Sequence, residues 1–300
     1  MRRCAGLIRL TRPVNMLICA ISVIAGGSLG GPPLTRLGDL GIQFFSDGPG
    51  GLFAWQGRTL MAAVSLSLVL AAGNVFNDVR DIECDRINVP SRPLPAGLVS
   101  PRAAGWFAGV LALLGLLAAV PAGLDLFVPA LGAVLLLCWY DLALKRVPFA
   151  GNVAVALLGG FAFLFGGMAG YAPLEAIVPA VFAFLYHLGR EIVKDSADLP
   201  GDTAAGIHTV ATVHGIRVSG SIAASVLLLL AAAIPVPFAA GWFGLPYLAV
   251  MALTVYPLLA YCIIRLFRAK SPEHFAPLSV ILKAGMPAGI LAVLIGFQWR

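Results

Sequence analysis

The sequence predicts an all-α, polytopic membrane protein, and three observations lead to this prediction. Hydrophobic residues make up 60% of the 300 residues and charged residues only 11%, whereas soluble globular chains carry about 25% charged residues. Apolar runs of about 20 residues, the length that an α-helix needs to cross a bilayer, recur along the chain. Lysine and arginine gather in every second segment between these runs. We therefore expect a helical bundle that forms a single membrane domain over residues 1–300.

Nine membrane helices are expected, separated by polar segments or by segments rich in glycine and proline. They cover residues 14–31, 58–77, 103–121, 126–143, 152–170, 174–193, 218–236, 243–266 and 278–298. The segment 31–57 has low hydrophobicity and is expected to be an outer loop. Four arginines precede the first apolar run and no small-residue cleavage site follows it, so we interpret this run as a membrane helix rather than a signal peptide.

The distribution of positive charge predicts the orientation. If the N-terminus is cytoplasmic, the inside segments are 1–13, 78–102, 144–151, 190–217 and 265–283. All of the 20 lysines and arginines then lie inside except Arg36, Arg58 and Arg300. This agrees with the positive-inside rule. An odd number of helices places the C-terminus outside, so we expect an integral protein of the cytoplasmic membrane, in contact with membrane lipids.

Two classes of function are excluded by composition. The net charge of +6 is spread over the loops, and the runs of lysine and arginine that nucleic-acid binding needs are absent from the sequence. The five cysteines are scattered, with no CxxC pair, which argues against a disulfide framework and against a thiolate metal site.

Eight of the fourteen acidic residues lie in two short clusters, which we call motif 1 (residues 74–85) and motif 2 (residues 190–202). In motif 1, Asn77, Asp81 and Asp85 are four residues apart, so they would line one face of a helix. In motif 2, Asp198 and Asp202 repeat this spacing. Carboxylates packed beside a membrane are costly unless a cation neutralises them. Because Mg²⁺ prefers hard oxygen ligands and shares them with substrate phosphates, and because both motifs fall on the cytoplasmic side, the sequence predicts a shared Mg²⁺-diphosphate site there.

Three stretches of the sequence resemble the UbiA-type intramembrane prenyltransferases. Asn77-Asp78-x-x-Asp81-x-x-x-Asp85, followed by Arg92-Pro93-Leu94-Pro95-Ala96-Gly97, is similar to the first signature of that family. Asp195-x-x-Asp198-x-x-x-Asp202 is similar to the second. A stretch after the fourth expected helix also resembles a loop of the family, through Tyr140-Asp141-x-x-x-Lys145-Arg146 with Pro148, Gly151 and Asn152. The resemblance runs from Arg12-Pro13-x-Asn15 to the last helix.

The resemblance implies a UbiA-like helical bundle with a cytoplasmic-side active site, in which Mg²⁺ binds an isoprenyl diphosphate and a lipophilic acceptor attacks its allylic carbon. It implies metal ligands at Asn77, Asp78, Asp81, Asp85, Asp195, Asp198 and Asp202. Catalytic roles fall to Asp81, Asp85, Asp198, Asp202, Tyr140 and Lys145. Substrate-binding roles fall to Arg92, Arg190, Lys194, Asn74 and Asn15.

Some of these residues also have a purely structural interpretation. Asp141 and Glu191 could simply pair with nearby Lys145 and Lys194. Tyr140 could be an interfacial aromatic residue, as we expect for Trp139. Arg12 and Asn15 are either a helix-start flank or part of the acceptor site, and the sequence leaves both open.

Motif 2 separates the possible acceptors. The stretch Arg190-Glu191-Ile192-Val193-Lys194-Asp195 most resembles the subgroup that transfers geranylgeranyl to geranylgeranylglyceryl phosphate in ether-lipid synthesis, and two added cations suit a phosphate-bearing acceptor. An aromatic acceptor, as in quinone, tocopherol or chlorophyll synthesis, is the alternative. A transporter with an acidic ion site is the alternative of another class, although such sites usually lie at the bilayer midplane.

Overall fold

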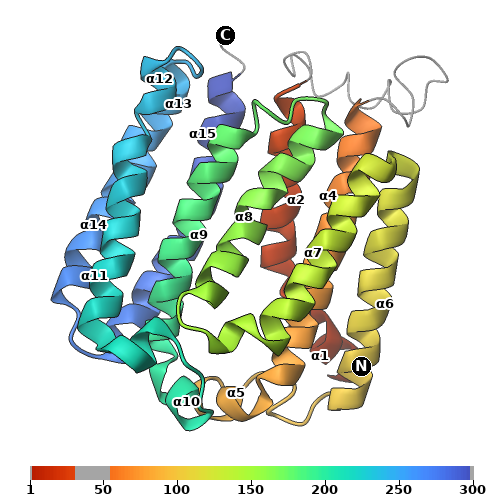
Figure 1. Ribbon diagram of the computed structural model, residues 1–300, viewed down its shortest axis with the longest axis vertical. Helices are drawn as coiled ribbons and strands as arrows, with labels where there is room; N and C mark the ends of the chain where they lie inside the picture. Colours follow the sequence, from red (N-terminus) through yellow and green to blue (C-terminus); the bar gives the residue numbers. More distant parts are fainter. Residues whose placement is uncertain (1, 31–54, 298–300) are drawn as a thin grey trace. The chain divides into compact units, whose positions relative to one another are not determined.

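The computed structural model describes residues 2–30 and 55–297, which form helices and contain no strand (Figure 1). Most of the expected outer loop 31–57 and the last residues of the chain lie outside this range. The described chain divides into two compact units. Unit 1 comprises the described residues up to 141 and residues 161–177, and unit 2 comprises residues 142–160 and the described residues from 178 onward.

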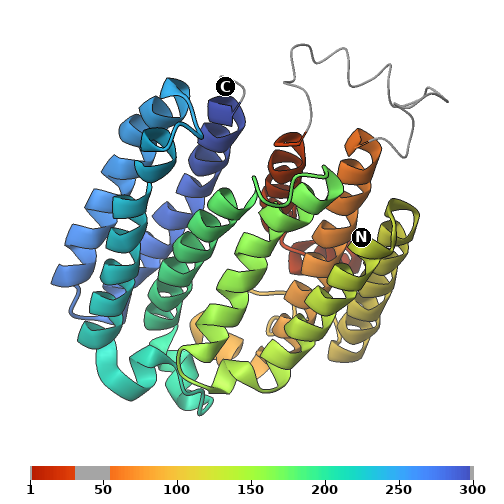
Figure 2. The same ribbon diagram turned by 45° about the horizontal axis from the view of Figure 1, so that its top comes forward.

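Unit 1 is built around one long helix, α4 (Trp55–Arg80). This helix packs most extensively on α6 (Pro101–Ala119) and next on α2 (Pro13–Ser28) (Figure 2). Glycine allows the close approach of α6, because a Cβ atom on Gly115 would lie 2.9 Å from Val69 Cγ2 and 3.0 Å from the Ser65 carbonyl oxygen. Small residues at helix contacts are typical of membrane bundles. The unit also contains α1 (Arg2–Leu10), α5 (Ile82–Asn88), η1 (Val120–Ala122), α7 (Leu124–Leu142) up to Asp141, and part of α8 (Ala150–Ala169).

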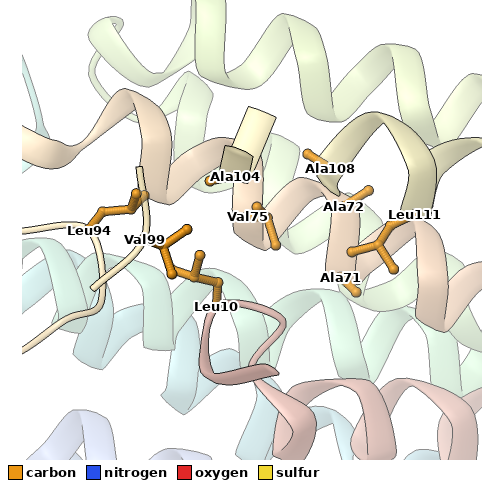
Figure 3. Packing of buried hydrophobic residues seen from close by; sticks show 9 residues of the cluster. All are labelled: Leu10, Ala71, Ala72, Val75, Leu94, Val99, Ala104, Ala108 and Leu111. Atoms are coloured by element: carbon orange, nitrogen blue, oxygen red, sulfur yellow. The ribbon is translucent and has the colours of Figure 1, made fainter. Parts of the chain in front are cut away.

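A cluster of buried apolar side chains fixes the short helix α1 against α4 and α6 (Figure 3). Leu10, the last residue of α1, is fully buried. It packs in the same cluster as Leu94 and Val99, which come from the proline-containing loop after α5. The other members of the cluster are Ala71, Ala72, Val75, Ala104, Ala108 and Leu111. The loop after motif 1 and the start of the chain are therefore held together by apolar packing.

Unit 2 contains the remaining helices. These are η2 (Leu144–Arg146), the first half of α8, α9 (Ile177–Ala197), α10 (Leu199–Ala204), α11 (Val210–Ala233), α12 (Val236–Ala239), α13 (Leu245–Val250), η3 (Met251–Val255), α14 (Tyr256–Arg268), η4 (Pro272–His274) and α15 (Phe275–Phe297). The main packing is between α11 and α14 and between α13 and α15. Two tyrosine hydroxyls connect elements of this unit. The Tyr247 hydroxyl donates to the Ile234 carbonyl at 2.7 Å, and the Tyr186 hydroxyl of α9 donates to the Leu282 carbonyl of α15 at 2.6 Å.

The number of membrane helices differs from the nine expected. Among the residues that the structure describes, seven helices are long and apolar enough to cross a membrane, and α1 with α2, bent by 41°, forms an eighth if the pair counts as one span. The remaining expected span, 174–193, coincides with α9. This helix has 21 residues but carries Arg190, Glu191, Lys194 and Asp195 in its last turns, so it is less apolar than the others.

Candidate active site

Motif 1 lies where the long helix α4 gives way to the short helix α5. Asp81 is the residue between them, with φ −99° and ψ 8°. The helical hydrogen bonds continue across it, because the Asp81 amide donates to the Asn77 carbonyl at 2.9 Å and the Asp85 amide donates to the Asp81 carbonyl at 2.7 Å. The expectation of one continuous helix face was therefore wrong in one respect: two helices meet at the central aspartate, although the four-residue register is kept.

The three aspartates of motif 1 are buried, and Asp78 and Asp85 contact arginine side chains. Asp78, Asp81 and Asp85 are 3%, 9% and 5% exposed. Arg92 donates from Nη1 to both oxygens of Asp85, at 2.7 and 2.6 Å, and lies 3.5 Å from Asp78 Oδ1. Burial raises the pKa of Asp85 above the ordinary range, and the charge of Arg92 opposes this shift. The site therefore gathers negative charge that needs cations to remain ionised.

Arg12 is a second cation of motif 1. Its Nη2 donates to Asp78 Oδ1, across 66 residues of sequence. Arg12 connects α1 to α2 in the left-handed backbone conformation, with φ 54° and ψ 69°, which is uncommon for a side-chain-bearing residue. Asn74 fastens the same junction, because its Nδ2 donates to the Thr11 carbonyl at 3.2 Å. Asn15 is half-buried in the first turn of α2, and its backbone N–H donates to the Arg12 carbonyl at 2.8 Å.

The end of α7 contributes to the same unit. Asn77 donates from Nδ2 to Asp141 Oδ1 at 2.7 Å, and Asp141 is only 6% exposed. Asp141 therefore has a partner within motif 1. Its neighbour Tyr140 is half-buried, whereas Trp139 is 58% exposed. Lys145, in η2 of unit 2, is half-buried.

Motif 2 has the same local backbone as motif 1. Asp198, with φ −85° and ψ 2°, separates α9 from the short helix α10. The Asp198 amide donates to the Lys194 carbonyl at 2.9 Å, and the Asp202 amide donates to the Asp198 carbonyl at 3.1 Å. In both motifs the next long helix starts at a hydroxyl cap, Ser100 for α6 and Thr209 for α11. The sequence therefore builds the same arrangement twice: a long helix, an aspartate at the break, a short helix and a capped helix.

The side chains of motif 2 are held by polar contacts within unit 2. Asp202 is 6% exposed and Asp198 is half-buried. Asp195 accepts a hydrogen bond at 2.6 Å from Nδ2 of Asn152, which is 5% exposed. Ser196 contacts Ser219 of α11, with 2.6 Å between the two hydroxyl oxygens. The last turn of α9 is therefore fixed against both α8 and α11.

Two cations of motif 2 share one carboxylate. Glu191 is 7% exposed. Arg190 Nη1 donates to its Oε1 at 2.6 Å and Lys194 Nζ donates to its Oε2 at 3.3 Å. The structural interpretation of Glu191 as a partner of Lys194 is thus confirmed, and Arg190 joins the pair.

The donor chemistry of both motifs suits Mg²⁺. The motifs offer carboxylate and amide oxygens, which are the hard ligands that this ion prefers. Over residues 2–30 and 55–297, no three histidine, cysteine, aspartate or glutamate side chains converge to form a complete metal cage. Mg²⁺ bound there would take its remaining ligands from substrate phosphates and water.

Three residues at these motifs were missed by sequence reasoning as site residues or left undecided: Arg12, Asn152 and Glu191. Arg12 and Asn152 reach their aspartates from 66 and 43 residues away, and such distant pairing leaves no periodic signal in a single sequence. The available signal was that Arg12 and Asn152 are polar residues at the edges of apolar runs.

Comparison with known proteins gives a consistent result. Residues 47–281 match the family model described as the UbiA prenyltransferase family. The digeranylgeranylglyceryl phosphate synthase of Methanopyrus kandleri is 36% identical over 289 residues, which cover 96% of this chain and 97% of that protein. That of Halobacterium salinarum is 38% identical over 250 residues, which cover 81% of each chain.

Solved structures show the same fold. A structure that concerns digeranylgeranylglyceryl phosphate synthase in membranes is 29% identical, has a TM-score of 0.72 and covers 100% of both chains. A UbiA homologue from Archaeoglobus fulgidus bound to GPP and Mg²⁺ is 18% identical, with a TM-score of 0.59 and coverage of 96% of this chain and 99% of that one. At that identity the second likeness concerns the fold alone.

Proposed function

The chain belongs to the UbiA prenyltransferase family, and on this premise we propose that it transfers a geranylgeranyl group from geranylgeranyl diphosphate to geranylgeranylglyceryl phosphate. The allylic C–O bond to diphosphate breaks, the acceptor hydroxyl oxygen forms a new C–O ether bond, and diphosphate and a proton are released. The observation that carries the choice of acceptor is the similarity over nearly the whole chain to relatives named digeranylgeranylglyceryl phosphate synthase.

The roles of the acidic residues follow from the chemistry of the leaving group. Bound Mg²⁺ supplies neutralisation of the diphosphate charge, without which diphosphate leaves poorly. We assign one Mg²⁺ to Asn77, Asp81 and Asp85 of motif 1, with Asp78 in support. A second Mg²⁺ would be held by Asp198 and Asp202 of motif 2, with Asp195 assisting. Asn77 and Asp195 are already oriented by the hydrogen bonds to Asp141 and from Asn152.

The basic and aromatic residues have complementary roles. Arg92 and Arg12 stabilise the ionised carboxylates of motif 1, and Arg92 can turn to the diphosphate when that ligand arrives. Lys145 donates to the leaving diphosphate. Tyr140 hydrogen-bonds the leaving oxygen or stabilises the allylic cation through the face of its ring. Asn15 and Asn74, beside Arg12, contact the substrate, and the side chain of Asn74 also holds the junction through Thr11. Arg190 and Lys194 bind the acceptor phosphate.

The protein is an integral membrane protein, and we propose nine spans, with α2 as the first and α9 as the sixth. The N-terminus and both motifs then face the cytoplasm and the C-terminus faces outside. In a cysteine-free background, single cysteines at Arg92 and Asp198 should react only with reagents that reach the cytoplasmic side. A cysteine at Tyr171, which is 66% exposed, should react from outside. Reaction of Arg92 and Asp198 from opposite sides would contradict the nine-helix topology.

The acceptor is tested with purified protein, labelled geranylgeranyl diphosphate and Mg²⁺. We expect an ether product with geranylgeranylglyceryl phosphate and none with a hydroxybenzoate- or quinol-type acceptor. Efficient prenylation of an aromatic acceptor, with no product from the glyceryl phosphate, would overturn the proposed acceptor but not the family. A transporter would release no diphosphate with any acceptor.

A further inference from the structure

The ion pairs around Glu191 form a compact group in the last turns of α9. Two cations meet one carboxylate, and each of its oxygens serves a different partner: Oε1 accepts from Arg190 at 2.6 Å and Oε2 accepts from Lys194 at 3.3 Å. The side chains of Glu191 and Arg190 are only 9% and 15% exposed. Lys194 also lies 4.0 Å from Asp195, so the local group carries two positive and two negative formal charges. An anionic ligand would therefore have to be recognised by directed hydrogen bonds rather than by excess positive charge.

Arg190 keeps hydrogen-bonding capacity that the described residues do not use. A guanidinium carries five N–H donors in a fixed plane. One Nη1 group of Arg190 donates to Glu191, whereas its Nε is buried and has no hydrogen-bond partner among the described residues. A buried donor without an acceptor is unfavourable, and a phosphate oxygen is the acceptor that matches a guanidinium best.

The platform that carries these groups is rigid within unit 2. One turn before Arg190, the Tyr186 hydroxyl binds the Leu282 carbonyl of α15 at 2.6 Å. Next to Arg190, a Cβ atom on Gly189 would lie 2.7 Å from Leu227 Cδ2 of α11. These contacts hold α9 close to α11 and α15 at this level. The direction of the Arg190 guanidinium then depends on the Glu191 side chain that it contacts.

We infer that Glu191 is a positioning residue for the acceptor phosphate: it holds Arg190, and with it Lys194, in the orientation that binds the phosphate oxygens. This inference rests on the proposed function, because it concerns the phosphate of geranylgeranylglyceryl phosphate. The inference predicts that removing the Glu191 charge weakens phosphate binding, which is the opposite of what electrostatics alone would give. Replacing Glu191 by glutamine makes the group more positive, so charge alone would tighten phosphate binding, whereas loss of orientation weakens it.

The test is the Michaelis constant of each substrate for Glu191→Gln. We expect the KM for geranylgeranylglyceryl phosphate to rise about tenfold, the loss of one well-oriented charged contact, while the KM for geranylgeranyl diphosphate stays within about twofold. Glu191→Asp keeps the charge on a shorter stem and should recover part of the affinity. If Glu191→Gln does not fold, the same separation of the two KM values is expected, at smaller size, for Glu191→Asp.

The matched control is Glu175→Gln, the same chemical change at an exposed glutamate outside both motifs, which should alter neither KM. A lower acceptor KM in Glu191→Gln would show that Glu191 only dampens charge and would overturn the inference. If the KM values for both substrates stay at their wild-type values while the melting temperature falls, Glu191 has only a structural role. That result would also overturn the inference. Wild-type protein that is inactive toward the glyceryl phosphate but active toward another acceptor would refute the proposed function itself.

Discussion

Asp81→Ala and Asp202→Ala should each reduce kcat by about a thousandfold, because each removes a carboxylate ligand from a site whose chemistry depends on neutralising diphosphate, and such stabilisation is worth several kcal/mol. Both residues are buried. Asp81 follows the last residue of α4 and Asp202 lies in the short helix α10, so neither belongs to a long apolar run. The variants should therefore keep the wild-type elution profile in detergent. The measurement is single-turnover formation of the prenylated product over a range of Mg²⁺ concentrations.

The same motif supplies a control for this experiment. Glu83 lies between Asp81 and Asp85 in sequence, but its side chain is 76% exposed and pairs with the exposed Arg86. Glu83→Ala should therefore keep near-native turnover, since an exposed pair of this kind contributes little. Near-native rates in Asp81→Ala or Asp202→Ala at limiting Mg²⁺ would contradict the assignment of the two motifs as metal ligands.

A double variant tests whether the two motifs serve one donor molecule. If they do, Asp81→Ala with Asp202→Ala should lose little more activity than either single variant, because residues that act as a unit are not additive. Losses that multiply would indicate that the motifs act on separate steps. The comparison of single and double variants therefore tests directly whether the two motifs form one site.

The sequence could predict the features that depend on the spacing of nearby residues. The positions of α6, α7 and α8 were expected to within a few residues, because each is a long apolar run bounded by polar residues. The register of Asp81, Asp85, Asp198 and Asp202 was also expected. What spacing could not show is the break at Asp81 and Asp198, because an aspartate near φ −90° and ψ 0° keeps the i to i+4 hydrogen bonds that a straight helix would have.

Other features needed three-dimensional information. Arg12 meets Asp78 only because α1, packed through Leu10, bends into α2 beside α4. The start of α11 at Val210 was missed because Thr212, His214 and Arg217 interrupt the apolar residues after the Thr209 cap. Gly215, with φ 81°, also interrupts the helix shortly before the expected start at 218. Helix α9 was expected as an apolar span, yet its charged last turns are the part that carries motif 2.

Motif 2 contains proposed ligands for both substrates, and Glu191 contacts the two cations among them. Asp195, Asp198 and Asp202 follow Arg190 and Lys194 on the same stretch of chain, so one segment holds both the proposed metal ligands and the proposed phosphate ligands. Lys194 lies 4.0 Å from Asp195 as well as 3.3 Å from Glu191. Its charge is therefore divided between the two carboxylates, whereas Arg190 contacts Glu191 alone among the ion pairs of unit 2 described above. Arg190 is for this reason the residue whose removal should separate acceptor binding from donor binding most cleanly.

Arg190→Ala should raise the KM for geranylgeranylglyceryl phosphate by about 10- to 100-fold, since a hydrogen bond to a charged group contributes about 1.5–3 kcal/mol, and should change the KM for geranylgeranyl diphosphate much less. Arg190→Lys keeps the charge but loses the planar arrangement of donors, so its effect should be intermediate. Arg265→Ala, which removes an exposed arginine at the end of α14, is the control and should change neither constant. An equal rise in both constants for Arg190→Ala would instead place Arg190 at the donor diphosphate. In that case the acceptor phosphate would have to be bound by other cations, and the relation between the two substrates in motif 2 would be the reverse of the one proposed.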